Sequence, residues 1–340
     1  SVVCGVFLAV VGALAARQVL ALMQSPPEVI ELSTLYLRIY FLGMPATMAY
    51  NFGAAILRGV GDTKRPLYYL TFSGVVNVVL NLIFVVIFHM SVAGVALATI
   101  ISQYISAIFV IKCLMNEDSG IRLEKQYLGI DKEILIRILQ IGLPAGVQGS
   151  LFSLSNVVIQ SSVNSFGATV VAGNSAAQNV EGFVYVAMNA FSQAVVAFVS
   201  QNLGAGKQER IQEGFRAGLR LIWMLSLPFA AGYFFFGEKM MACFLKEPTR
   251  EALSSGLAFL RIVAPFYFVV ATKLITDGIL RGSGRMRQFM TATFTDLLLR
   301  VMIAFVLSAT PLKSVGIWCA WPIGWTIAAG MSLRFYKKAL

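Results

Sequence analysis

Polar side chains recur every three or four residues within an apolar stretch near position 181. The series consists of Gln178, Glu181, Tyr185, Asn189 and Ser192. This spacing places them on one face of a helix. A carboxylate inside a membrane span is costly and is a functional candidate by default. We therefore expect Glu181 to bind a cation or to carry a coupling proton, with a structural hydrogen bond between helices as the alternative.

The preceding apolar stretch carries a second polar series. Its members are Gln148, Asn156, Gln160 and Asn164, with Phe152 at the intervening position. Side-chain amides ligate Na⁺ or hold polar groups of a substrate, and they also join membrane helices, at only about 0.6 kcal/mol on average. Both roles stay open for Asn156 and Gln160. Pro144 removes one backbone donor near the start of this stretch. It predicts a bend, either static or acting as a hinge between moving lobes.

Two pairs of opposite charge each have their members four residues apart. They are Lys273 with Asp277, and Asp296 with Arg300. At this spacing the two partners of a pair can meet on one helix and neutralise each other. We therefore predict two structural ion pairs rather than binding groups.

The composition predicts an all-α polytopic membrane protein. The chain has 340 residues, of which 58% are hydrophobic and 13% charged, and its mean hydropathy is +0.76. Soluble domains are about a quarter charged, and runs of ~20 apolar residues are long enough to span a bilayer. Ten such helices are expected at about 1–23, 30–57, 66–88, 91–115, 134–163, 167–202, 212–236, 252–280, 287–309 and 314–335.

The charge distribution indicates topology rather than nucleic-acid binding. The net charge is +11, but the basic residues lie mostly between the apolar runs instead of on one soluble face. One set of alternate connectors carries 18 of them, and the opposite set carries only Lys239, Lys246, Arg250 and Lys313. The positive-inside rule then places both ends of this chain in the cytoplasm. We expect a multi-pass protein of the plasma membrane, with the lipid bilayer as a partner and no nucleic acid.

The inventory of reactive side chains argues against an enzyme. The four cysteines lie far apart, and His89 is the single histidine. Neither a metal site nor a catalytic cluster fits this pattern. Gly204-Ala205-Gly206-Lys207 is followed by Gln208, so it does not match a phosphate-binding loop. We expect no enzyme activity, no cofactor and no resident metal, with Na⁺ or H⁺ as the coupling ion.

The chain contains an internal duplication, in which two separate matches share one offset. Leu37-Arg38-Ile39 corresponds to Leu260-Arg261-Ile262, and Ile56-Leu57-Arg58-Gly59 corresponds to Ile279-Leu280-Arg281-Gly282. The polar stretch 116–133 is the natural cytoplasmic linker between lobes 1–115 and 134–340. The offset leads us to expect six helices in each lobe, the first lobe lacking two helices, or about 90 residues, before position 1. Such halves would be parallel repeats.

Four motifs together resemble those of the MATE (multidrug and toxic compound extrusion) family. They are the Leu57–Pro66 turn, the Val92–Thr99 segment, the Ser200–Lys207 turn and Gly142-Leu143-Pro144. The resemblance runs along the whole chain. It implies a MATE-like pair of helical bundles around a large cavity, and a secondary antiporter that exports small amphiphilic or cationic compounds by alternating access.

One position departs from this resemblance. Many MATE relatives carry an aspartate where this chain has Asn81, in the segment that begins at Asn77. Asparagine cannot exchange a proton, although its carbonyl can ligate Na⁺. We count Asn77 and Asn81 among the candidate substrate or ion ligands. We expect a monomer with a small-molecule substrate, and the alternative function is a flippase for lipid-linked precursors.

Overall fold

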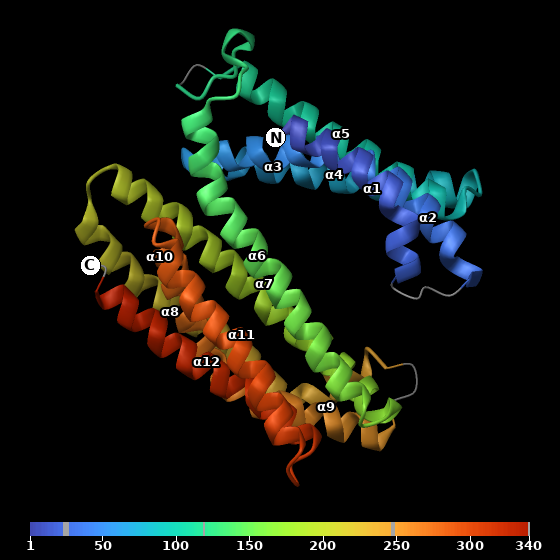
Figure 1. The fold of residues 1–340 in the computed structure, drawn as a ribbon, viewed down its shortest axis with the longest axis vertical. Helices are drawn as coiled ribbons and strands as arrows, with labels where there is room; N and C mark the ends of the chain where they lie inside the picture. The colour runs from blue at the N-terminus through green and yellow to red at the C-terminus, as the bar shows by residue number, and fades with distance from the viewer. Residues whose placement is uncertain (23–26, 118–119, 246–248, 339–340) are drawn as a thin grey trace. The chain divides into compact units, whose positions relative to one another are not determined.

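The structure is a computed structural model that describes residues 1–22, 27–117, 120–245 and 249–338. Over these ranges the chain is helical and contains no β-strand, so the predicted all-α class is confirmed. The chain divides into two compact units, Ser1–Ile130 and Asp131–Leu340. Figure 1 shows that each unit is a bundle of helices.

The described residues of the first unit form five α-helices. They are α1 (Val2–Leu22), α2 (Pro27–Phe41), α3 (Met44–Gly59), α4 (Lys64–Leu82, extended by a π-helical turn, Ile83–Ile87) and α5 (Ser91–Met115). Helix α5 packs against α2, α3 and α4. The core of this unit lies between α3 and α5, where Leu57, Val110 and Leu114 are buried together.

The second unit contains the remaining seven α-helices of the described chain. They are α6 (Lys132–Asn164), α7 (Ala168–Gly204), α8 (Gln208–Ala242), α9 (Arg250–Val263), α10 (Tyr267–Gly282), α11 (Met286–Ser308) and α12 (Ser314–Lys337). A 3₁₀ turn, Ala264–Phe266, joins α9 to α10. Helices α11 and α12 lie side by side (Figure 1), and α10 packs against α7, α8 and α12.

Two of the predicted spans are not continuous helices. The range 30–57 breaks at Leu42-Gly43, and the range 252–280 breaks at Ala264–Phe266. Pro265 lacks the backbone N–H that a continuous helix needs, and Pro45 occupies the first turn of α3, where a missing N–H is tolerated. The two breaks fall at corresponding positions of the repeat, so the duplication extends to this irregularity.

Eight helical stretches among the described residues are long and apolar enough to cross a membrane. The predicted ranges 30–57 and 314–335 are not among them. The first is divided into helices of 15 and 16 residues. The second, in α12, contains three tryptophans, whose indole groups lower its hydropathy. Eight spans are sufficient to make this a multi-pass membrane protein.

Helix boundaries repeat with the offset seen in the sequence. The first residue of α3, Met44, corresponds to the first residue of α10, and the last residues of these helices also correspond. In the same way, α5 begins at Ser91 and α12 begins at the corresponding Ser314. The turns after α3 and α10 match as well. Gly61 has φ +92° and Gly284 has φ +71°, the left-handed conformation that favours glycine. The two halves are therefore structural repeats over these helices.

Charged residues join the end of α5 to the α3–α4 turn. The Arg65 guanidinium donates to Glu117 at 2.6 Å and also to Asp62. Burial raises the pKa of the Asp62 carboxyl, but hydrogen bonds from Arg65 and from backbone N–H groups outweigh this effect, so the pKa lies below its usual value. Two residues of the predicted linker 116–133, Asp118 and Ser119, lie outside the described residues. Lys246, one of the four basic residues of the opposite connectors, also lies outside them.

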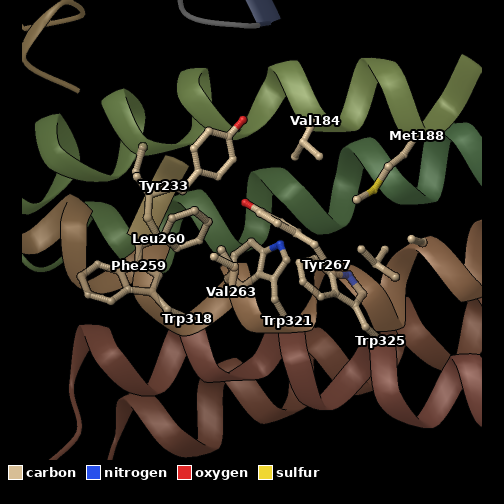
Figure 2. Packing of buried hydrophobic residues seen from close by; sticks show 14 of the residues in the cluster. Val184, Met188, Tyr233, Phe259, Leu260, Val263, Tyr267, Trp318, Trp321 and Trp325 are labelled. Atoms are coloured by element: carbon tan, nitrogen blue, oxygen red, sulfur yellow. The ribbon is translucent and has the colours of Figure 1, made fainter. Parts of the chain in front are cut away.

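Large aromatic side chains fill the core of the second unit. Tyr233, Phe259, Tyr267 and Trp318 are fully buried, and the Phe259 ring meets the Trp318 ring edge-on at 6.2 Å. Figure 2 shows Tyr267 and the tryptophans packed beneath Val184 and Met188. The Trp318 indole donates to Asn174 at 3.1 Å, which satisfies a polar atom inside the core.

Two glycines allow α7 and α9 to touch through their backbones. A Cβ on Gly173 would lie 2.2 Å from the carbonyl oxygen of Ala252, and a Cβ on Gly256 would lie 2.4 Å from that of Gly173. Small residues commonly permit such close approach between membrane helices. This contact fixes α7, the helix that carries Glu181.

Replacing Gly173 with alanine tests this contact. We expect Gly173→Ala to lower the free energy of unfolding by about 1–3 kcal/mol, because the helices must separate to admit the methyl group. Unfolding in mixed micelles measures the change. The matched control is Gly182→Ala on the same helix, where a Cβ meets nothing within 4 Å. Equal stability of the two variants would contradict the close contact.

Candidate functional site

A cavity of about 820 Å³ lies within the second unit. Five helices, α6, α7, α10, α11 and α12, contribute its walls. Its ionisable lining residues are Glu181, Tyr185, Lys273, Asp277, Arg281, Asp296 and Arg300. The size falls within the range of about 300–1,000 Å³ that is typical of small-molecule sites.

The two polar series predicted from the sequence line this cavity except for Asn164, whose Oδ1 accepts a hydrogen bond from the Gln160 amide at 2.9 Å. Helix α7 contributes Gln178, Glu181, Tyr185, Asn189 and Ser192, and α6 contributes Gln148, Phe152, Asn156 and Gln160. Of these side chains, Ser192 also joins two helices, since its hydroxyl donates to the Leu274 carbonyl at 2.9 Å. The amide of Asn189 donates to the backbone of its own helix. The predicted stripes therefore line one common space.

Glu181 lies at the inner wall of the cavity and is only 7% exposed. Its Oε1 has no hydrogen-bond partner among the described residues. The hydroxyl of Tyr267, buried nearby on α10, also lacks one, whereas the Tyr233 hydroxyl donates to the Val180 carbonyl at 2.7 Å. Glu181 interacts electrostatically with both tyrosines and with Arg300. A buried carboxylate oxygen without a partner in the described chain is a candidate group for binding a cation or a proton.

Lys273 and Asp277 form the predicted ion pair. The Lys273 ammonium donates to Oδ2 of Asp277 at 2.6 Å, and both side chains are buried. The Ser332 hydroxyl, on α12, donates to the other oxygen, Oδ1, also at 2.6 Å. Both oxygens of this carboxylate are therefore engaged, and the pair ties α10 to α12.

The second predicted pair, Asp296 with Arg300, is wrong. Among the described residues no hydrogen bond or ion pair engages Oδ1 of Asp296, or Nε or Nη2 of Arg300. The guanidinium lies instead over the rings of Phe152 and Trp321, at 5.2 and 5.6 Å. Cation–π attraction draws Arg300 towards α6 and α12. Helical spacing allowed the pair but did not determine it.

The remaining sequence candidates lie elsewhere. Asn77 and Asn81 are on α4 of the first unit, where Asn77 donates to Ser102 at 3.4 Å and Asn81 donates to Oδ1 of Asn77 at 3.1 Å. Pro144 lies inside α6, which continues through it. Neither asparagine lines the cavity described above, and their role as ligands stays a prediction.

Sequence reasoning missed the aromatic wall of the cavity. Trp321 and Trp325 line it from α12, and the Trp325 ring lies 6.2 Å from that of Tyr185. The signal was present, since these tryptophans are four residues apart and share a helix face. The sequence provided no way to predict that this face meets α7 rather than lipid.

A protein-family model described as MatE matches residues 1–83 and 144–306. The chain belongs to the MatE family. This MatE protein is 29% identical over 342 residues to the probable multidrug resistance protein YoeA of Bacillus subtilis (strain 168), covering 98% of this chain and 73% of YoeA. It is 32% identical over 273 residues to YpnP, a probable multidrug resistance protein of the same strain, covering 79% of this chain and 60% of YpnP.

The fold of this MatE protein is that of solved MATE structures. A MATE crystal structure in the bent conformation matches with a TM-score of 0.92 at 22% identity, over 99% of this chain and 75% of that one. The chain thus spans about three quarters of that structure and between 60% and 73% of the two Bacillus relatives.

Removing one partner of the buried ion pair should destabilise this MatE protein. We expect Lys273→Met to lower the free energy of unfolding by about 3–5 kcal/mol, because it leaves the Asp277 carboxylate buried without a counter-charge. The double variant Lys273→Met with Asp277→Asn should recover most of this loss, since the new amide oxygen would still accept from Ser332. Unfolding in mixed micelles measures both. A double variant no more stable than the single one would contradict the pairing.

Proposed function

We propose that this protein is a secondary active antiporter that exports small amphiphilic, often cationic, compounds by alternating access, driven by a Na⁺ or H⁺ gradient. The observation that carries the proposal is Glu181, a buried carboxylate with a free oxygen on the wall of an 820 Å³ cavity. Such a group binds a cationic substrate, a coupling Na⁺ or a proton, but not all of them at once. Competition of this kind is what couples export to an ion gradient.

The walls of the cavity suit an amphiphilic cation. Aromatic rings attract cations and also pack against the apolar parts of a ligand. Tyr185, Trp321 and Trp325 present such rings on the wall that also carries Glu181. The amides of Gln178, Asn156 and Gln160 supply neutral oxygens for a substrate or for Na⁺. The two Bacillus relatives are named as probable multidrug resistance proteins, which supports the same substrate class.

The rest of the proposed mechanism concerns the two units. In our proposal, 1–115 and 134–340 act as rocking lobes joined by the linker 116–133, with Pro144 as a hinge and Asn77 and Asn81 as further ligands in the first lobe. The basic connectors favour a topology with both ends of this chain on the cytoplasmic side of the plasma membrane. The protein acts as a monomer, and the coupling ion is its only cofactor.

Transport in proteoliposomes tests the role of Glu181. We expect efflux of a fluorescent organic cation only under an imposed Na⁺ or H⁺ gradient. Glu181→Gln should slow this efflux by about 10–100-fold, which corresponds to the loss of one charge-assisted contact. The matched control is Glu238→Gln, which removes an exposed carboxylate from α8 and should transport normally.

Three results would contradict parts of the proposal. If Glu181→Gln transports as well as the unmodified protein, Glu181 is structural. If efflux needs no gradient, secondary active transport is wrong. If no cation moves under either gradient, while a fluorescent lipid-linked precursor crosses the bilayer, the flippase function replaces the exporter.

A further inference from the structure

Charges of both signs border the cavity with polar atoms left unsatisfied. These atoms are Oε1 of Glu181, Oδ1 of Asp296, and Nε and Nη2 of Arg300, within the part of the chain that the structure describes. All three side chains are buried, and Arg300 is only 2% exposed. A buried charged donor without an acceptor is strongly unfavourable. A ligand in the cavity that accepts hydrogen bonds from Arg300 would lower this free-energy cost.

The guanidinium of Arg300 contacts two aromatic rings, while its Nε and Nη2 make no hydrogen bond within the described residues. Phe152 from α6 and Trp321 from α12 present their rings to it at 5.2 and 5.6 Å. These contacts use the face of the guanidinium plane, whereas hydrogen bonds use its edge. Nε and Nη2 lie along one edge and match the two oxygens of a carboxylate or a phosphate.

The neighbouring carboxylates of Asp296 and Glu181 interact electrostatically with Arg300, but within the described chain no carboxylate accepts a hydrogen bond from this edge. Both oxygens of Asp277 are engaged, by Lys273 and Ser332. Oδ1 of Asp296 faces α12, where a Cβ on Gly324 would lie only 2.7 Å from it. Glu181 interacts electrostatically with Arg300 but forms no ion pair with it within the described chain. A ligand that enters the cavity can supply the acceptor for Arg300, in place of water.

We propose that Arg300 binds an acidic oxygen group, a carboxylate or a phosphate, carried by the compound that occupies the cavity. This inference rests on the proposed export function and narrows its substrate class. The aromatic walls select an aromatic amphiphile, and the Glu181 carboxylate pairs with a cationic group of the same compound. The preferred ligand is thus zwitterionic rather than purely cationic.

A pair of dyes that differ only in one acid group tests the proposal. Rhodamine B carries a free carboxylate beside its cationic ring system, and in its ethyl ester that carboxylate is blocked. Binding to the protein in phosphatidylcholine nanodiscs is followed by fluorescence anisotropy, with empty nanodiscs subtracted. We expect the unmodified protein to prefer rhodamine B. Arg300→Gln should weaken rhodamine B binding by about 10–100-fold and leave binding of the ester unchanged or stronger.

Two further variants separate binding from structure. Arg300→Lys keeps the charge but loses the two-donor edge, and should bind rhodamine B with intermediate affinity. The matched control is Arg261→Gln, which removes an exposed arginine that also lies over a ring, that of Phe234 at 5.7 Å, outside the cavity. It should bind both dyes normally. If Arg300→Gln weakens both dyes equally, or if the unmodified protein has no preference, the proposal is wrong.

Competition experiments on the unmodified protein keep the test decisive even if Arg300→Gln does not fold. Benzoate should displace rhodamine B, and benzyl alcohol should not; equal displacement would overturn the proposal.

Phosphatidylglycerol in the nanodisc distinguishes the source of the oxyanion. If it weakens rhodamine B binding to the unmodified protein more than to Arg300→Lys, the anion is a lipid phosphate; without that difference, it belongs to a small compound.

The inference and the proposed function can fail separately. Gradient-driven efflux of the ester with no preference for rhodamine B would leave the exporter in place and remove the anion site. A preference for rhodamine B without transport of either dye would leave the anion site in place and remove the exporter.

Discussion

The ion pair between Lys273 and Asp277 neutralises two of the charges inside the second helix bundle. Two ionised groups in a low-dielectric interior are tolerated only when they are paired and their remaining lone pairs are satisfied. Here the Ser332 hydroxyl completes the set at 2.6 Å. The link joins α10 to α12 and leaves no free oxygen on Asp277. Because both oxygens of Asp277 are engaged, the charged side chains of the cavity that keep polar atoms without a partner in the described chain are Glu181, Asp296 and Arg300.

The position of Glu181 depends on packing two turns away. The backbone contact of α7 with α9 at Gly173 lies eight residues before Glu181, which is about 12 Å along a helix. Behind Glu181, Tyr233 and Tyr267 fill the interior and their rings meet edge-on at 5.8 Å. A dense aromatic core resists collapse into the cavity. The contact at Gly173 and the packing of Tyr233 and Tyr267 therefore hold the Glu181 carboxylate at the wall of the cavity.

Periodicity predicted the helices and both cavity-lining stripes because a polar face in an apolar helix has few places to lie. It did not predict the breaks at Leu42-Gly43 and Ala264–Phe266, since the hydropathy stays high across them. The choice of partner for Arg300 was also beyond the sequence. Asp296 is four residues away on the same helix, but the rings that Arg300 contacts come from positions 152 and 321. Packing of α11 against α6 and α12 therefore determined that Arg300 contacts the two rings rather than Asp296.

Four charged residues of the cavity have uncharged counterparts in the first copy of the repeat. In the first copy of the repeat, the positions that correspond to Lys273, Asp277, Asp296 and Arg300 are Tyr50, Ala54, Ser73 and Asn77. All four are uncharged, although the helices that carry them, α3 and α4, correspond to α10 and α11. Tyr50 instead donates its hydroxyl to the Pro66 carbonyl at 2.9 Å, and Asn77 donates to Ser102. Corresponding helices therefore carry neutral side chains at these positions in the first copy and charged side chains in the second. A charged cluster is expensive to bury, and at these corresponding positions of the described chain only the second copy carries one.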